Sequence, residues 1–471
     1  MRIHRVLFSL ALMMVTVAPM PAGPSPQLPP PAIETRPTVS PEWLMPYRDA
    51  AARLIGASLA SDAAWQRLAY IGDTFGHRLS GSPNLEAAIR WAVEEMQRDG
   101  LENVRAEPVK VPHWVRGRES LEIVGTIPQP LVMLGLGNSI GTPPGGIEAD
   151  LVVVHSFEEL DAMRARVRGR IVLFNVPFAT YGETVRYRSA GPSRAATLGA
   201  VAALVRSVGP PGLRTPHTGS LQYAEGQPQI PAAAVTAEDA ARLQRMSDRG
   251  TQVRLKLMME AHFLPDADSA NVVGEIRGRE RPDEVVVIGG HFDSWDVGTG
   301  STDDGSGCVA TWEALRLMKK LNLRPRRTVR VVLWTNEENG GRGGVSYRDR
   351  HQTELGSHVM LMESDSGVLH PRGFGFSGTD AARAKIRDIA MLLSGIQVDA
   401  IGPSGGGADI SPSVQQANIP ALSLESDGNY FLIHHTPADT IDKIDPMEMS
   451  RSAAAIAVMA YVVAEMQETL R

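Results

Sequence analysis

The C-terminal part of the chain, from residue 271 onward, alternates short apolar segments with longer segments of helical spacing. We expect strands at residues 272–276, 284–288, 328–334, 359–362 and 421–424. We expect helices at about 306–321, 380–393 and 446–470. The expected strands are apolar at most positions rather than at alternate ones, which indicates burial on both faces. The sequence therefore predicts an α/β fold, with a mainly parallel, mixed sheet flanked by helices.

The preceding region, residues 116–265, has a different character. It contains short apolar runs, such as 171–176, around a middle stretch rich in Gly and Pro. Because 471 residues are too many for one ordinary core, a second folded unit is expected. We predict one α/β domain, formed by residues 42–115 and 270–471 and interrupted by an inserted β-rich domain at 116–269.

The first residues have the pattern of an export signal. Arg2 and Arg5 precede thirteen positions, 6–18, that are apolar except for Ser9 and Thr16. Thirteen apolar positions are too few to span a bilayer and suit the apolar core of a signal peptide, although a short anchor that stays attached is the alternative. We predict a signal peptide at 1–22 and a linker with seven prolines at 23–41. The protein would then be exported, periplasmic or secreted, without stable membrane insertion after cleavage.

The charge of the chain excludes one class of partner. The chain has 53 acidic and 47 basic side chains, a net charge of -6 and no basic block, so nucleic acid is not expected as a partner.

The only cysteine, Cys308, can form no internal disulfide. It lies at helical spacing with Trp312 and Leu315, so we expect it in the core rather than at a catalytic centre.

Side chains that bind metals well follow the second expected strand. His291 and Asp293 come just after it, and Asp303 opens the next helix. Residues two apart in an extended segment point to the same side. His291 could therefore bind a metal while Asp293 accepts a hydrogen bond from its second ring nitrogen. Asp303 could bridge two cations, although it or its neighbour Asp304 could instead cap the helix.

Carboxylates and a histidine also follow the later strands. Glu337 and Glu338 follow the third expected strand, Asp365 the fourth and His435 the fifth. A Glu pair is usually a solvated surface feature, but this pair ends a strongly apolar strand and precedes Gly340, where backbone could approach a substrate closely. Two imidazoles and several carboxylates at the ends of neighbouring strands are what a hydrolytic two-metal site needs. This mixed set favours zinc, although cobalt or manganese could use the same ligands.

Three histidines in the region 116–265 do not fit this pattern. His155, His217 and His262 share no spacing and have no acidic partners at strand ends. We therefore expect them in the core or on the surface rather than at a metal. A helix is also expected to begin after Thr236, with Thr236 as its N-cap.

Taken in order, the motifs resemble those of a known peptidase family. They are HFDSWDVG, TDDGSG, WTNEENGG, MESDSG and HHTPADT. This order resembles the M28 family of zinc metallopeptidases, most closely its plasma glutamate carboxypeptidase (carboxypeptidase Q) branch. The resemblance extends to LSGSPNLEAAI and NVVGEIRG and covers residues 42–115 and 270–471. It implies a zinc aminopeptidase/phosphorylase-hydrolase-like fold, and the insertion at 116–269 resembles a protease-associated domain.

The resemblance also implies a role for each candidate residue. The resemblance implies that His291 and Asp365 bind one zinc, that Glu338 and His435 bind the other, and that Asp303 bridges both. It also implies that Glu337 is the general base and that Asp293 supports His291. The family ligand lies four residues before an Asp-Thr pair, here Asp439 and Thr440, which favours His435 over His434. Two Zn²⁺ per chain and a homodimer are implied as well.

The function that the resemblance implies is exopeptidase activity on dipeptides or short peptides with a free amino terminus. One alternative is a glutaminyl cyclase, which has a related fold but a single zinc; the presence of both His291 and Asp365 argues against it. A second alternative is a binding or receptor protein on the same fold without catalysis. Loss of ligands would indicate that class, and the sequence has lost none of them.

Overall fold

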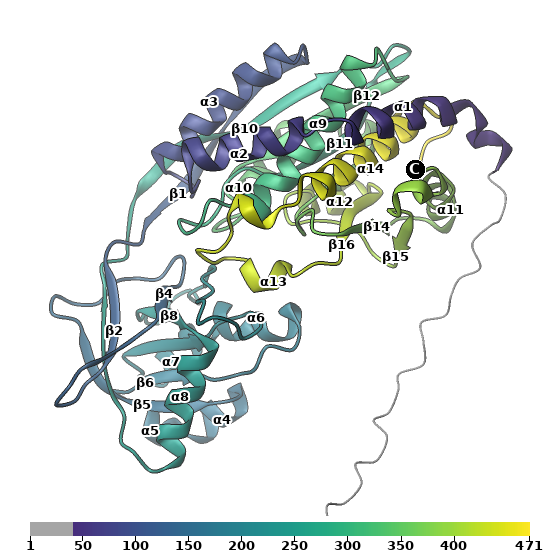
Figure 1. Cartoon of the computed structure of the whole chain (residues 1–471). Helices are drawn as coiled ribbons and strands as arrows, with labels where there is room; N and C mark the ends of the chain where they lie inside the picture. The colour runs from purple at the N-terminus through teal and green to yellow at the C-terminus, as the bar shows by residue number, and fades with distance from the viewer. Residues whose placement is uncertain (1–40) are drawn as a thin grey trace, which may run out of the picture. The chain divides into compact units, whose positions relative to one another are not determined.

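The computed structural model describes residues 41–471, and contacts group them into one unit. The signal peptide predicted at 1–22 and all of the predicted linker except Pro41 lie outside the described residues. Two eight-stranded sheets organise the described part of the chain (Figure 1). Each sheet is flanked by helices, so the prediction of an α/β fold is confirmed.

The first sheet is mixed, with a parallel centre. Its order is β1-β10-β12-β11-β13-β16-β14-β15. Strands β12, β11, β13 and β16 are parallel neighbours. The pairs β1–β10, β10–β12 and β14–β16 are antiparallel, and β14–β15 is parallel. The bounds are β1 Glu102–Val115, β10 His262–Ile276, β11 Arg281–His291, β12 Arg327–Trp334, β13 His358–Glu363, β14 Pro371–Ser377, β15 Ala400–Gly402 and β16 Ala421–Ser426. All five predicted strands occur, each longer than expected, while β14 and β15 were not predicted.

Both faces of the first sheet are buried, which explains its unbroken apolar strands. In β11, Val286 and Ile288 face one core, which includes the helices α1 (Arg48–Leu59), α9 (Ser306–Lys320) and α14 (Pro446–Glu465). Val285 and Val287 face the opposite core, which includes Tyr347 of α10 (Arg342–Arg350) and Val414 of α12 (Ser411–Ala417). Cys308 is fully buried in the first core, as predicted.

Helix α14 is the only helix among residues 41–471 that is long and apolar enough to cross a membrane. Its most apolar window is 83% buried against the rest of the protein, which is typical of a core helix. Asp445 caps its N-terminus by accepting hydrogen bonds from the backbone of Met447 and Glu448.

The second sheet lies between residues 119 and 259, which we name the second-sheet region. Its order is β3-β2-β9-β5-β6-β7-β8-β4, with β5 to β8 parallel. Its strands are β2 Glu119–Ile123, β3 Gln129–Leu131, β4 Met133–Gly135, β5 Ile147–Val154, β6 Ile171–Phe174, β7 Ala202–Arg206, β8 Ala232–Val235 and β9 Arg254–Met259. Its helices are α4 Phe157–Ala162, α5 Arg164–Val167, α6 Tyr181–Ser189, α7 Gly191–Thr197 and α8 Ala237–Asp248. The description of this region as β-rich was therefore incomplete, because helices occupy two of the three connections between its parallel strands, β5 to β6 and β6 to β7.

Hydrogen bonds define the start of α8 and the strands that connect this region to the first sheet. Thr236 caps α8 by accepting a hydrogen bond from the backbone N-H of Asp239, as predicted. Strands β1 and β10 pair along almost their whole length, from Glu102 opposite Glu275 to Val115 opposite His262. The chain therefore leaves the first sheet and returns to it through neighbouring strands.

Candidate metal centre

The parallel strands of the first sheet end at one edge, and the predicted site residues gather there. The register sets His291, at the end of β11, opposite Trp334 at the end of β12, and Gly289 opposite Glu363 at the end of β13. The loops after these strands carry Glu337, Glu338 and Asp365. The carboxyl edge of a parallel sheet is where α/β proteins commonly bind ligands.

One group of possible ligands surrounds His291. Its Nε2 lies 3.2 Å from Asp365 Oδ1 and 3.3 Å from Asp303 Oδ1. One ligand atom from each residue lies within 4.8 Å of the other two, so the three could hold one cation. The His291 and Asp303 side chains are buried, and that of Asp365 is 29% exposed.

A second group surrounds His435. Its Nε2 lies 3.1 Å from Glu338 Oε2 and 3.2 Å from Asp303 Oδ2. Asp303 thus directs one carboxylate oxygen toward His291 and the other toward His435. This is the arrangement that a carboxylate shared by two cations requires.

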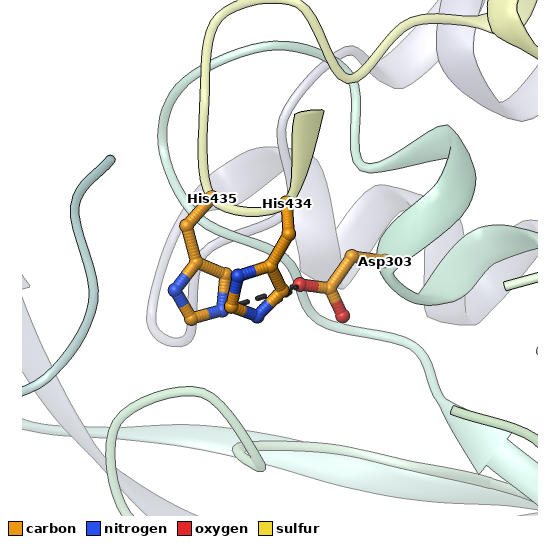
Figure 2. Close-up of side chains that lie close together, drawn as sticks. All are labelled: Asp303, His434 and His435. Carbon is orange, nitrogen blue, oxygen red and sulfur yellow. Dashed lines mark ion pairs between the residues drawn. The ribbon is translucent and has the colours of Figure 1, made fainter. Parts of the chain in front are cut away.

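His434 lies beside His435 and faces the same carboxylate (Figure 2). The two rings stack with centroids 3.5 Å apart, and His434 Nε2 is 3.6 Å from Asp303 Oδ2. His434 Nδ1 is buried and has no hydrogen-bond partner in the described part of the chain. The sequence analysis did not select this residue, because the family motif assigns one ligand to this turn.

The electrostatics of the cluster favour a cation. Burial raises the pKa of Glu338 to about 7, although His435 opposes this rise. Burial also raises the pKa of Glu337 well above its usual range, and neighbouring carboxylates add to the effect. For Asp303, burial acts in the same direction, but the nearby imidazoles of His291 and His435 outweigh it and hold the pKa well below the usual range. The site therefore crowds carboxylates together in a buried place.

Buried carboxylate oxygens without hydrogen-bond partners indicate whether these residues fit a metal. Asp303 Oδ2 and Glu338 Oε1 are buried and have no hydrogen-bond partner among residues 41–471. A buried carboxylate oxygen without a partner is destabilising, and metal coordination is one of the ways in which proteins satisfy it. Imidazole nitrogen and carboxylate oxygen are both ligands that zinc prefers. The donor set and its unsatisfied oxygens therefore fit zinc.

Asp293 contacts its neighbours differently from the prediction. His291 Nδ1 donates to the backbone oxygen of Asp293 at 3.0 Å, while the Asp293 carboxylate is 3.8 Å away. That carboxylate instead accepts the backbone N-H of Glu337 at 3.0 Å and of Glu338 at 3.3 Å. The hydrogen bond expected between the two side chains is therefore absent, because the turn after β12 supplies better donors. Asp293 fixes the backbone that carries both glutamates.

Two other aspartates hold the loop that carries Asp303. Asp304 accepts the backbone N-H groups of His291 and Gly307, each at 3.1 Å. Asp439 accepts those of Thr302 at 2.6 Å and Asp303 at 3.0 Å. Asp304 therefore takes the turn-supporting role left open above, and Asp439 supports the loop rather than an imidazole.

A cavity of about 330 Å³ opens onto the cluster. Four of the candidate ligands, Asp303, Glu338, Asp365 and His435, line it together with Glu337, Tyr430 and Phe431. The second-sheet region contributes Tyr181, Arg188 and Ser220. Arg188 is 5% exposed and lies 3.4 Å from His435 Nδ1 through its Nη1. Tyr181, Arg188 and Ser220 could not be found from the sequence, because no spacing links them to the motifs; Arg188 is 247 positions from His435.

Comparisons of the sequence and of the structure with known proteins point to the same family. The profile of peptidase family M28 matches residues 271–460. Carboxypeptidase Q of Mus musculus is 45% identical over 433 residues, which cover 91% of this chain and 92% of that protein. The crystal structure of a peptidase M28 precursor from Shewanella amazonensis is 34% identical, with a TM-score of 0.87 over 90% of this chain and 98% of that one. A zinc aminopeptidase from Bacillus subtilis is 18% identical and shares the fold, with a TM-score of 0.65 over 86% of this chain and 95% of that one.

Proposed function

The chain belongs to peptidase family M28, as a metallopeptidase similar to carboxypeptidase Q, and on that premise we propose that it is a two-zinc exopeptidase. Its substrates would be dipeptides or short peptides with a free amino terminus. One observation carries this proposal: Asp303 directs its two carboxylate oxygens toward two separate groups of ligands. Because each of the two groups has enough ligands for one zinc, the site favours this function over that of a single-zinc glutaminyl cyclase.

We assign one zinc to His291, Asp365 and Asp303, and the other to Glu338, His435 and Asp303. His435 is preferred to His434 because its Nε2 lies close to two carboxylates, Glu338 and Asp303, whereas His434 lies 3.6 Å from only one of them. Its second ring nitrogen also lies near a carbonyl oxygen, that of Thr218, at 3.4 Å. Ligand histidines commonly make such a hydrogen bond.

We assign the role of general base to Glu337. When bound, two zinc ions would activate a water molecule and polarise the peptide carbonyl. Glu337 lines the cavity beside the ligands, and no hydrogen bond or ion pair ties down its carboxylate within residues 41–471. A free carboxylate can take the proton of the attacking water and then deliver it to the leaving amine. Asp293, through the backbone of Glu337, holds this carboxylate in place.

The proposed preference for short substrates is supported by a buried arginine, Arg188, in the cavity. Arg188 has no carboxylate within ion-pair distance in the described chain, and its Nε is buried without a partner. Its Nη2 donates to the Tyr181 hydroxyl at 2.8 Å. A guanidinium group pairs well with a carboxylate, so we assign Arg188 to the terminal carboxylate of a short peptide. A longer chain would carry that carboxylate out of reach.

We also propose the domain organisation, location and assembly that the sequence predicts. Residues 42–115 and 270–471 would form the catalytic domain, and residues 116–269 an inserted domain resembling a protease-associated domain. A signal peptide at 1–22 would direct export to the periplasm or the medium, which N-terminal sequencing of the exported protein would test. The resemblance implies a homodimer.

A panel of peptides tests the proposed function. Free dipeptides, the same dipeptides blocked at either end, and longer peptides are assayed with and without a chelator. We expect cleavage of the free dipeptides, loss of activity after chelation, recovery with zinc, and little cleavage of peptides with a blocked amino end. Equal cleavage of free and amino-blocked peptides, or full activity after removal of metal, would contradict the proposal.

A further inference from the structure

We propose that a segment of the second-sheet region, His217–Thr218, positions the metal ligand His435. This inference rests on the proposed function, because it takes His435 as a zinc ligand. The segment and the ligand are 217 residues apart in the sequence, yet they face each other in the fold. The second-sheet region would then be part of the metal centre rather than only a cover for the substrate.

Three contacts join the segment to the turn that carries the ligand. The Thr218 N-H donates to the His435 carbonyl oxygen at 3.0 Å. His217 Nδ1 lies 2.8 Å from the His434 carbonyl oxygen, and His435 Nδ1 lies 3.4 Å from the Thr218 carbonyl oxygen. Both residues of the turn are therefore held through their backbone, and the ligand is also held through its ring.

One contact of the His435 ring suits the tautomer that a metal ligand needs. His435 Nδ1 lies 3.4 Å from the Thr218 carbonyl oxygen, which can only accept, and 3.4 Å from Arg188 Nη1, which can only donate. The hydrogen bond to Thr218 forms when Nδ1 carries the hydrogen, as it does when Nε2 binds a metal. In the neutral ring, Nε2 then has a free lone pair, and it is this atom that faces Asp303 and Glu338. The carbonyl of Thr218 thus acts on the ring in the way that a partner of a ligand histidine usually does.

The backbone of His435 explains why the turn needs support. Its φ is +60°, in the left-handed region that residues other than Gly adopt infrequently. Such a conformation is unfavourable and persists where surrounding contacts fix it. Bonds to the carbonyl oxygens of His434 and His435 are contacts of this kind.

His217 is itself held rigidly. It is 2% exposed, and its backbone N-H donates to Ser207 Oγ at 3.0 Å. Its ring lies against Gly209, where an added Cβ would be 2.3 Å from the imidazole. The absence of a side chain at Gly209 therefore makes room for the ring. A donor fixed in this way can hold the His434 carbonyl in one position.

The experiment compares zinc binding in variants of the full chain. His217→Leu removes the donor, and His217→Asn keeps an N-H near the position of Nδ1. Gly209→Ala is a second disrupting variant, which displaces the ring without removing it. His358→Leu is the matched control, because His358 is also fully buried and its Nδ1 faces a backbone carbonyl, that of Glu354, at 3.0 Å. Competition with a zinc chelator measures each affinity, and thermal unfolding measures stability.

We expect His217→Leu and Gly209→Ala to weaken one of the two zinc ions by roughly 10- to 100-fold, the usual effect of losing a partner of a metal ligand. His217→Asn should restore most of that affinity, and His358→Leu should lower Tm while both zinc affinities stay unchanged. Unchanged zinc affinities in both His217→Leu and Gly209→Ala would overturn the proposal. A wild-type chain that binds fewer than two zinc ions would instead overturn the metal assignment on which it rests.

Discussion

The two groups of proposed metal ligands are held by different kinds of structure. His291 and Asp365 follow strands β11 and β13, whose backbones are fixed by hydrogen bonds across the sheet. His435 lies in a turn after a four-residue helix, α13 (Tyr430–Ile433), and has a positive φ. We name the first the strand-end group and the second the loop group.

The two groups are positioned by different kinds of contact. A strand end is placed by the register of the whole sheet, so its ligands need few contacts of their own. Glu338 of the loop group also follows a strand, β12, but His435 has no such frame. The carbonyl oxygens of His434 and His435 are instead bonded to His217 and Thr218 of another region. We therefore expect the loop group to be the more easily disturbed of the two.

Glu337→Gln should have the largest effect on activity. Glu337 belongs to the strand-end side but is assigned no metal, so the variant separates chemistry from metal binding. We expect kcat to fall by roughly 10²- to 10⁴-fold, the usual contribution of a general base. Zinc content, measured by elemental analysis of the purified protein, should stay at two per chain. Retained turnover would remove Glu337 from the mechanism.

Asp303→Ala should have the largest effect on metal content, because this residue is shared by the two groups. We expect it to lower the occupancy of both zinc ions, as measured by elemental analysis. Asp365→Ala is the control, since Asp365 contacts only the strand-end group and should affect only one ion. If the two variants lost the same single ion, Asp303 would not be a bridge.

The residues proposed for the strand-end group could be selected from the sequence for a physical reason. Each of its residues lies within a few positions of an apolar strand, and parallel strands bring such positions to one edge. The partner of His291 was harder to predict, because the choice between the side chain and the backbone of Asp293 depends on the turn after β12.

The loop group could be predicted only in part. A motif pointed to His435, but nothing local connects it with Arg188, His217 or Thr218. These contacts arise when the second-sheet region folds, and single-sequence patterns report neighbours in the sequence rather than in space. Apart from α8, the helices of that region were missed because they lack strong periodicity, and so was the strand β14, whose sequence PRGFGFS is rich in Gly.

Arg188→Gln tests the contribution of the second-sheet region to substrate binding. We expect KM for free dipeptides to rise by roughly 10- to 100-fold, because a hydrogen bond to a charged group contributes about 1.5 to 3 kcal/mol. The same dipeptides with an amidated carboxyl end are the control and should be cleaved with little change by the variant. An equal loss on both substrates would show that Arg188 supports His435 rather than the substrate.

His434→Phe should have the smallest effect and separates the two adjacent imidazoles of the loop group. Phe keeps a ring to stack on His435 but has no nitrogen to bind a metal. If His435 alone is the ligand, zinc content stays at two, and kcat/KM falls by less than about tenfold, the range expected for an altered aromatic contact. His435→Phe, by contrast, should lose one zinc. Loss of zinc from His434→Phe would exchange their roles, and then the bonds from His217 and Thr218 would hold the backbone of the turn without orienting the ligand ring.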